Sequence, residues 1–498
     1  MTSQTIKRYH HGSVGYLLVQ VLVYGAIGLI ILGSLIGWAG TNLQLTKKSL
    51  AREKALQIAE AGIEYYRWHL AHAPQDFKDG QITSGPYVHD YFDKSDNKIG
   101  SFTLDITAPV TGSTIVTVVS TGRVITDPQV ARVLEVKFAV PSLGKYALVA
   151  NTDMRFGIGT ETFGPIHSNG GIRFDGLAHN IVTSAKAKYN DPDHNGDQEF
   201  GVHTHMNPPP PAGSMTASFR PFEAPPSTLS ARTDVFLAGR KFPVPAFDFN
   251  GLTADLADMK IAANNGGLYF AASGALGYNL VLKTDNTFDL YKVDTLLPPP
   301  KNHCSKQNAD GQEGWGTWSV NDQTFVANYT VPTNGMIFVE DNVWVEGQVN
   351  ETRVTIATGR FPENPSTDTN ITINNNLKYT NYDGRDIVAL VGQNNVNIGM
   401  DSQNFLEIDA ALVAKNGRVG RYYYTSDCQP YDQRDTIRLY GMIATNERYG
   451  FAYTNSNNNM TMGYQNRYIT YDNNLLYSPP PFFPSTSDQY QIISWREK

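Results

Sequence analysis

The chain has 498 residues, a formal net charge of −7 and 17% charged residues, below the roughly 25% of an average soluble domain. Its 11% aromatic residues exclude a disordered chain, and its acidic balance gives no general basis for a nucleic-acid partner. The only two cysteines, Cys304 and Cys428, lie far apart, which excludes a disulfide-rich scaffold and a four-cysteine zinc site.

The first predicted element is a membrane helix. Residues 14–39 contain no charge and no proline, and they exceed the roughly 20 residues that a helix needs to cross hydrocarbon. A cleaved secretory signal is the alternative, because Lys7 and Arg8 form a basic segment before the apolar stretch. The apolar core of such a signal is usually only about 7–15 residues long, so the sequence favours a membrane-embedded helix.

The helix is expected to continue beyond the membrane as a stalk. Helix formers follow without a proline until Pro74, which predicts one helix over residues 16–74, a rod of very roughly 85 Å. Apolar residues in its second half recur at spacings of three and four and therefore share one face. This stripe consists of Leu56, Ala59, Ile63, Tyr66 and Leu70.

The stretch GYLLVQVLVYGAIGLIILGSL, residues 15–35, resembles the N-terminus of type IV pilins and pseudopilins. The following IAEAGIEYYRWHL resembles the helix of PilX-like minor pilins. The resemblance implies a leader over residues 1–15, cleavage after Gly15, Tyr16 as the first mature residue, and other pilin-like subunits as partners. Gly12 before Ser13 is an alternative cleavage point.

Several residues of this helix depart from the family pattern or have two interpretations. Gln20 stands where the family carries Glu, so it can hydrogen-bond but cannot ion-pair with a neighbouring subunit's terminal amine. The alternative is that Gln20 only lies at the membrane interface. Gly33 and Gly37 form a GxxxG pattern that lets another helix approach closely, although glycine is common in membrane helices.

The orientation in the membrane also has two interpretations. Basic residues after the apolar stretch outnumber those before it, and charge alone would therefore place the body in the cytoplasm. The pilin resemblance and the composition of the body favour the opposite orientation. We expect a single-pass protein of the cytoplasmic membrane with its body outside the cytoplasm, in the membrane or in a pilus.

The chain beyond the helix is predicted to be mainly β, so the expected fold class is α+β. Residues 75–142 contain alternating apolar runs and two turn signals, which predict a pilin-like antiparallel β-meander. Residues 143–465 contain many short strands separated by Gly, Asn and Asp, which favour a parallel β-helix-like solenoid over an irregular β-sandwich. A Pro-rich insertion is expected at 186–245, a helix at 250–267, and a Pro/aromatic tail at 466–498.

One acidic segment has two interpretations, a solvated acidic turn and a calcium loop. Oxygen-bearing residues alternate in DPDHNGDQE as in the first half of an EF-hand, but position twelve is Val202. The candidate ligands are Asp191, Asp193, Asn195, Asp197 and Glu199, and a solvated acidic turn is the alternative. His203 and His205, with His194 nearby in sequence, allow a transition-metal site in principle, but packing or hydrogen-bonding roles are favoured. His167 is expected to be a turn residue.

Evidence for an enzyme is weak in the sequence. Asp386, Asp401 and Asp409 are candidates only by residue type for a polysaccharide-degrading site, and no common catalytic motif is present. Cys304 and Cys428 form one disulfide if the body lies outside the cytoplasm, and otherwise are two free thiols.

Together these features predict a non-catalytic, type IV pilus-associated, minor pilin-like surface protein. Its body would serve pilus assembly or adhesion to an unknown surface, glycan or protein. The alternatives are a membrane-tethered β-helix enzyme that degrades polysaccharides and a single-span surface protein that never enters a pilus.

Overall fold

The computed structural model shows two compact units. It describes residues 14–142, 144–192, 198–206, 223, 225, 228–249, 251–301, 304, 316–455, 459–483 and 489–498. The head unit is formed by the chain up to Thr107, by Val116–Phe138 and by Ile492–Lys498. The body unit is formed by Ala108–Ile115 and Ala139–Gln491.

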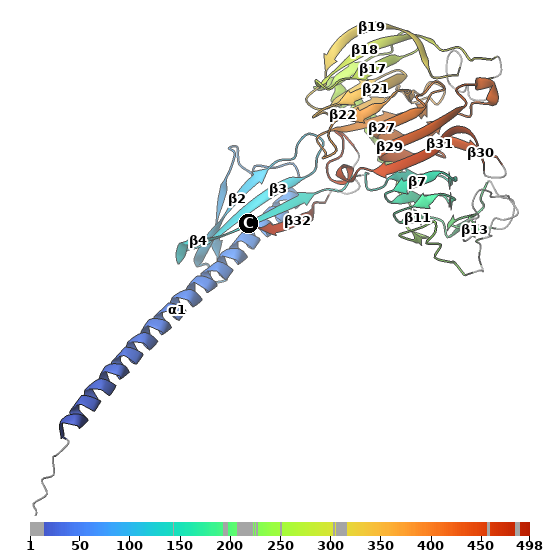
Figure 1. Ribbon diagram of the computed structural model, residues 1–498. Coiled ribbons are helices and arrows are strands. Elements are labelled where there is room, and N and C mark those ends of the chain that lie inside the picture. Colours follow the sequence, from blue (N-terminus) through green and yellow to red (C-terminus); the bar gives the residue numbers. More distant parts are fainter. Residues whose placement is uncertain are drawn as a thin grey trace, which may run out of the picture. The chain divides into compact units, whose positions relative to one another are not determined.

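The head begins with α1 (Val14–His72), one uninterrupted helix of 59 residues (Figure 1). The predicted continuous helix is therefore confirmed. Ala59, Ile63, Tyr66 and Leu70 of the predicted stripe are buried and Leu56 is half-buried. The absence of proline lets the hydrogen-bond ladder continue, and the helix ends just before Pro74.

A five-stranded sheet completes the head, in the order β1-β2-β3-β4-β32. Its strands are β1 (Tyr87–Phe92), β2 (Lys98–Thr107), β3 (Val116–Val124), β4 (Asp127–Ala139) and β32 (Gln491–Glu497). β1 to β4 pair antiparallel, as the meander prediction requires. Alternate residues such as Phe102, Leu104 and Val118 are buried, and α1 packs against β2 and β3.

The C-terminal strand is a correction to the predicted tail. Residues 460–471 form a strand of the body, whereas β32 lies beside β4 in the head, where the Lys498 amide donates to the Val133 carbonyl at 3.0 Å. The body is therefore inserted in the chain between two neighbouring strands of the head sheet. No local sequence signal predicts this pairing, because the two strands are separated by the entire body.

The body is built mainly from parallel strand pairs, and its first ladder has ten strands. In ladder order they are β16 (Leu268–Phe270), β20 (Met336–Val339), β22 (Arg353–Thr358), β25 (Ile387–Gly392), β27 (Phe405–Ala414), β29 (Gln433–Thr445), β5 (Leu148–Ala150), β8 (Ile166–Ser168), β11 (Val182–Ser184) and β15 (Arg240–Lys241). Its register aligns aliphatic residues in a column, so each strand buries its neighbour's side chains. The column includes Ile337, Ile356, Leu390, Leu412, Ile443, Leu148, Ile166 and Val182.

The order of this ladder differs from the order in sequence. β29, near the end of the body, pairs with β5, at its beginning, through Ile443 and Leu148. The beginning and the end of the body therefore meet inside the ladder, and each of the two segments continues the stacking of the other. An asparagine column crosses the same junction: Asn151 donates to Asn446 at 2.9 Å, and Asn169 donates to Asn151 at 2.8 Å.

Two further parallel ladders run through the body. One contains β17 (Tyr278–Leu282), β21 (Val343–Val349), β23 (Ile371–Ile373), β26 (Val396–Ile398) and β28 (Val419–Arg421). The other links β21, β24 (Leu377–Tyr379), β27, β29, β31 (Met460–Tyr471), β7 (Thr160–Phe163) and β10 (Leu177–Ala178). These ladders agree with the predicted parallel stacking, while the solenoid class itself stays a prediction.

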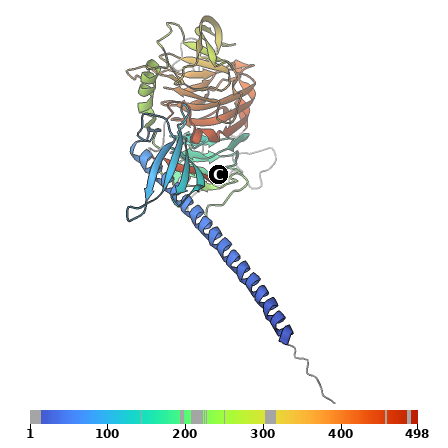
Figure 2. The same cartoon turned by 90° about the vertical axis from the view of Figure 1, so that its left-hand side faces the viewer.

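Smaller elements surround these ladders. β18 (Thr287–Leu296) and β19 (Val320–Thr330) extend the body antiparallel, and β30 (Ala452–Thr454) pairs antiparallel with β31. β6 (Met154–Phe156), β9 (Ile172–Phe174) and β14 (Val202–His203) form a parallel sheet, and β12 (Lys188–Tyr189) pairs with β13 (Glu199–Phe200). The helix predicted at 250–267 is α2 (Gly251–Asn264), which covers one flank of the body with Leu256 and Met259 (Figure 2).

Candidate functional site

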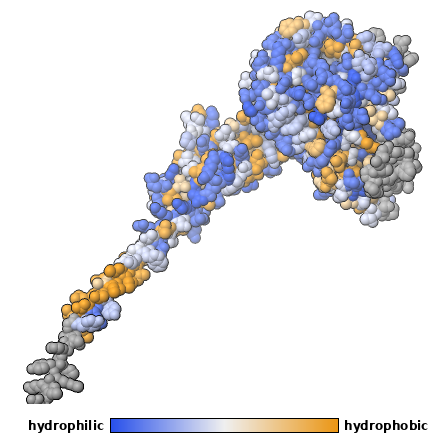
Figure 3. Space-filling view, in the orientation of Figure 1, coloured by the Kyte–Doolittle hydropathy of each residue, from blue (hydrophilic) through white to orange (hydrophobic). Residues whose placement is uncertain are grey.

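The first half of α1 exposes its apolar side chains. Leu29 and Ile30 are 73% and 69% exposed, and the helix is long and apolar enough to cross a membrane (Figure 3). Tyr16 and Gln20 are exposed on this half, Gly15 lies in its first turn, and Gly12 and Ser13 lie outside the described residues. A side chain added at Gly33 or Gly37 would meet no atom of the described chain within 4 Å, so this face is open to a partner helix.

Four ligand-type side chains converge in the body near β12–β14. Asp191, Glu199, His203 and His205 are all buried, and one ligand atom of each lies within 4.8 Å of the others. Glu199 is in β13 and His203 in β14, while Asp191 follows β12. Nε2 of His203 is 2.8 Å from Glu199 Oε2 and 3.5 Å from Asp191 Oδ2, and Nε2 of His205 is 2.8 Å from Glu199 Oε1.

This cluster differs from the ligand set expected of a calcium loop. Asp191 and Glu199 belong to both, but Asp193, Asn195 and Asp197 lie outside the described residues. The two imidazoles, for which the sequence favours packing or hydrogen-bonding roles, share Glu199 between them. The His-x-His pattern that begins in β14 is the sequence signal for this pair of histidines, because alternate residues of an extended segment share a side. That the pair lies close to Asp191 depends on the fold.

The buried charges shift one another's ionisation. Burial by itself would raise the pKa of Glu199, but the two neighbouring imidazoles lower it to about 2. Burial opposes the charge on His203, yet the carboxylates of Asp191 and Glu199 outweigh it and raise its pKa to about 9. The pKa of His205 is lowered, because burial outweighs its bond with Glu199. Glu199 is therefore ionised, which is the form of a carboxyl that coordinates a cation, whereas His203 would release its proton on coordinating one.

A second layer of buried groups holds this cluster. Nε of Arg173, in β9, donates to Asp175 Oδ2 at 2.7 Å, and Nη1 of Arg173 lies 3.7 Å from Asp191 Oδ2. The backbone amide of His205 donates to Asp175 Oδ1 at 2.8 Å. Asp175 therefore fixes the backbone at His205 while Arg173 faces Asp191.

Cys304 and Cys428 form a disulfide, with their Cα atoms 4.7 Å apart. Both residues are buried, beside Met400 and Tyr424, and Cys428 ends the short 3₁₀ helix Ser426–Cys428. The bond links segments separated by 124 residues. Such a bond restricts the unfolded chain and is typical of oxidising compartments outside the cytoplasm.

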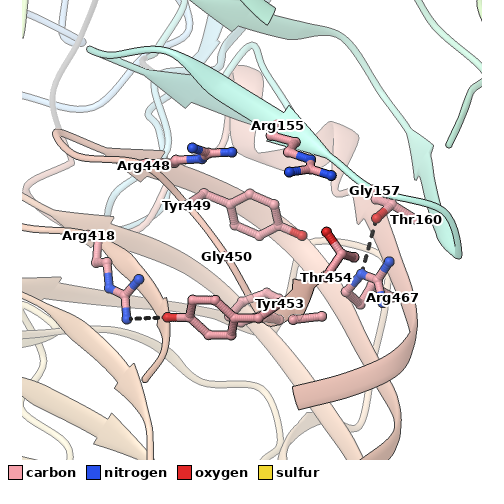
Figure 4. A pocket seen from close by; sticks show the side chains of 12 residues that line it. Arg155, Gly157, Thr160, Arg418, Arg448, Tyr449, Gly450, Tyr453, Thr454 and Arg467 are labelled. Carbon is pink, nitrogen blue, oxygen red and sulfur yellow. Dashed lines mark hydrogen bonds between the residues drawn. The ribbon is translucent and has the colours of Figure 1, made fainter. Parts of the chain in front are cut away.

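A basic pocket of about 240 Å³ lies beside β6, β7, β30 and β31 (Figure 4). The described residues that line it include four arginines and no acidic residue; the arginines are Arg155, Arg418, Arg448 and Arg467. Arg418 donates to the Tyr453 hydroxyl at 3.1 Å and Arg467 to the Thr160 hydroxyl at 3.1 Å. Since Tyr453 and Thr160 are uncharged, they orient the guanidinium groups of Arg418 and Arg467 without neutralising them.

The carboxylates proposed for an enzyme lie in separate environments. Asp386 is 1% exposed and accepts backbone amides from Thr352 and Thr380. Asp401 pairs with Arg434 at 3.4 Å. Asp409 accepts the Tyr379 amide and the Tyr382 hydroxyl, each at 2.8 Å.

An open aromatic groove gives Asp409 the strongest claim to a chemical role among these carboxylates. Glu407, Tyr382, Tyr440 and Tyr468 line the groove with it. Burial and the neighbouring Glu407 raise the pKa of Asp409 despite its hydrogen bonds. No sequence pattern predicts this groove, because its residues come from separate strands.

His167 is a correction to the sequence analysis. It lies in strand β8 instead of a turn, is buried, and has Thr183 and Asn169 as hydrogen-bond partners at 3.0 and 3.2 Å. Burial lowers the pKa of His167, so the imidazole is neutral at pH 7.

Comparison with known proteins does not identify a family for this chain. No known family model and no curated protein sequence matches the chain. A solved structure, that of the competence-associated pilin ComZ from Thermus thermophilus, is similar over 90% of this chain and 97% of its own, with 14% identity and a TM-score of 0.32. At that score the likeness supports no conclusion about this chain, so the proposals below depend on its own residues.

Proposed function

We propose that this chain is a non-catalytic, pilin-like protein that is anchored in the cytoplasmic membrane by α1 and displays its β-rich body outside the cytoplasm. The observation that carries the proposal is the division of α1. Its first half exposes apolar side chains throughout, and its second half is covered by an antiparallel sheet. A helix that is apolar all round needs lipid or other helices as its surroundings.

The open face at Gly33 and Gly37 supports association with equivalent helices. Small residues let helix backbones approach closely in a membrane, where van der Waals packing drives association. The uncharged Gln20 side chain is exposed on the same half of the helix and is available to a neighbouring subunit or to the interface. The disulfide between Cys304 and Cys428 supports a body outside the cytoplasm.

The test is the N-terminal residue of the mature protein from membranes and from sheared surface material. A chain that begins at Tyr16 or at Ser13 supports pilin-type processing. Gly15→Leu and Gly12→Leu are matched variants: only the variant at the true cleavage point would accumulate the precursor. An intact Met1 found solely in membranes contradicts pilus assembly and leaves the single-span surface protein.

For adhesion, we propose that the basic pocket of Figure 4 takes an anionic group of the surface ligand, such as a carboxylated glycan. The positive charge of the four arginines that line the pocket attracts a carboxylate. Arg448→Gln should weaken binding of the full chain to acidic polysaccharide, and the effect should shrink as salt rises. Equal binding by the variant and by the matched control Arg385→Gln, whose arginine is exposed elsewhere on the body, contradicts this assignment.

One observation favours the enzyme alternative, namely the raised pKa of Asp409 in an aromatic groove beside Glu407. A carboxyl with a raised pKa beside a second carboxyl is the pattern of a glycosidase acid and its partner. If full-length protein cleaves a polysaccharide and Asp409→Asn abolishes the cleavage, the non-catalytic proposal is wrong. Asp401→Asn, outside the groove, is the control.

A further inference from the structure

We propose that Asp191, Glu199, His203 and His205 bind one zinc ion that ties the β12–β13 hairpin to β14. The four side chains supply two nitrogen and two oxygen donors, which together complete the tetrahedral set that zinc prefers. Because all four are buried, they leave no open position for water or substrate. The inferred site is therefore structural and does not depend on the function of the membrane helix.

The donor distances fit a single ion. Four donors around zinc at about 2.0–2.1 Å lie roughly 3.3 Å from one another. The His203 Nε2 atom lies 2.8 Å from one Glu199 oxygen and 3.5 Å from an Asp191 oxygen, which brackets that spacing. All four donors fall within 4.8 Å of each other, so side-chain shifts of about an ångström bring them to the spacing around one ion.

The surroundings of His203 support a bound ion independently of the donor distances. Its side chain is fully buried, and its Nδ1 atom has no hydrogen-bond partner among the described residues. Its Nε2 atom lies at ion-pair distance from Glu199 and Asp191 but outside hydrogen-bond geometry with either. A buried imidazole without a hydrogen bond loses stability unless something else satisfies it. Nε2 faces the carboxylates of Asp191 and Glu199. A cation between these groups would satisfy the imidazole.

The donor types favour zinc over calcium. Calcium takes six to eight oxygen ligands, whereas imidazole suits zinc and other transition metals. The cluster also has an outer layer, in which Asp175 holds the backbone amide of His205 and Arg173 lies beside Asp191. Outer groups of this kind fix the ligands before the ion binds.

The inferred position explains what the ion does for the fold. β12 and β13 form a hairpin of only two residue pairs, and β14 is a two-residue strand. Elements this short have few backbone hydrogen bonds and depend on other links for their order. Zinc bound by a residue after β12, one in β13 and two at β14 would crosslink all three.

The first test is the metal content of the full chain, purified in detergent with a histidine-free tag and measured by inductively coupled plasma mass spectrometry. The expected result is about one zinc ion per chain. Less than about a tenth of an equivalent of any transition metal in folded protein, after dialysis against zinc as well, overturns the proposal. Bound calcium at this position in place of zinc also overturns it.

Matched variants test the ligands. His203→Gln should lose most of the zinc, whereas His179→Gln should keep it, because His179 pairs with Glu161 away from the cluster. Equal zinc content in the two variants contradicts the assignment. Should His203→Gln fail to fold, cobalt(II) replaces zinc in the wild-type chain: visible bands of tetrahedral cobalt support the site, and octahedral cobalt or none overturns it.

Removal of the metal tests the crosslinking. A zinc chelator should increase proteolysis within residues 186–206 several-fold and leave cleavage around α2 unchanged, and added zinc should reverse the effect. Unchanged cleavage at 186–206 in protein proven free of zinc would show that the ion does not hold these strands.

Discussion

The two halves of α1 obey the same local rules but bury their apolar residues differently. Between residues 16 and 50 every residue is exposed, apart from the half-buried Gly28, and Leu29 is 73% exposed. Farther along, Ile63 and Leu70 are 0% and 1% exposed, because the sheet of the head covers them. The backbone of a continuous helix thus needs no tertiary partner, but its apolar side chains need to be covered. None of the described residues covers the first half, and lipid or other helices are the surroundings that we propose for it.

The largest effect is expected from a charge placed in the exposed half of α1. Leu29→Arg puts a guanidinium near the middle of the apolar stretch, at a cost of about 2.5–3.5 kcal/mol on insertion scales. We expect the variant to be extracted from membranes by alkaline carbonate. Leu50→Arg, near the end of the exposed segment, should stay in the pellet; extraction of both variants or of neither would contradict the membrane assignment.

The next effect removes a buried side chain of the second half. Ile63→Ala should lower the free energy of unfolding of the head by about 2–5 kcal/mol, because it leaves a cavity between α1 and the sheet. Ile36→Ala, at a side chain 69% exposed, is the matched control and should change stability in detergent little. Hydrogen exchange of the β3 amides measures both, and equal protection in the two variants would refute the contrast.

A smaller effect comes from the glycines. A side chain at Gly122 in β3 would collide with the backbone of Ala55 and Ala59 on α1, so Gly122→Ala should cost about 1–3 kcal/mol. A side chain added at Gly33 would meet no described atom outside its own stretch of helix within 4 Å, so Gly33→Ala should leave the stability of the head unchanged. The melting temperature of the purified chain distinguishes them. A loss at Gly33 as large as at Gly122 would mean that the first half packs within the chain.

The smallest effect concerns one hydrogen bond at the end of the helix. The Tyr66 hydroxyl donates to the Asp76 carbonyl at 3.0 Å, so Tyr66→Phe should cost about 0.5–1.5 kcal/mol. Thermal unfolding followed by circular dichroism measures this change. Since the ring stays in place, a loss above that of Ile63→Ala would show that the hydroxyl contributes more than a single bond can.

Sequence reasoning succeeds where the determining contacts are local. The length of α1, the buried face of its second half and the four-stranded meander follow from runs of helix formers and from alternation within strands. The α2 helix is also predicted to within a few residues, because the Gly266–Gly267 pair stops the helical pattern just after its last residue, Asn264.

The remaining features depend on residues that are distant in sequence. The β29–β5 pairing joins the end of the body to its start, and the position of β32 beside β4 requires the chain to return to the head after the whole body. The ligand cluster is missed for the same reason: its carboxylates resemble a loop of alternating oxygens, whereas the fold brings His203 and His205 to Glu199. Local pattern shows the residue types, and only the tertiary structure shows which of them meet.

The most direct test of the central claim is labelling of the body with a membrane-impermeant maleimide. Thr284→Cys places a thiol in the exposed turn between β17 and β18, and the native cysteines are joined in the disulfide. The account predicts labelling of intact spheroplasts at the level seen after lysis. Labelling that appears only after lysis would put the body in the cytoplasm and contradict the account.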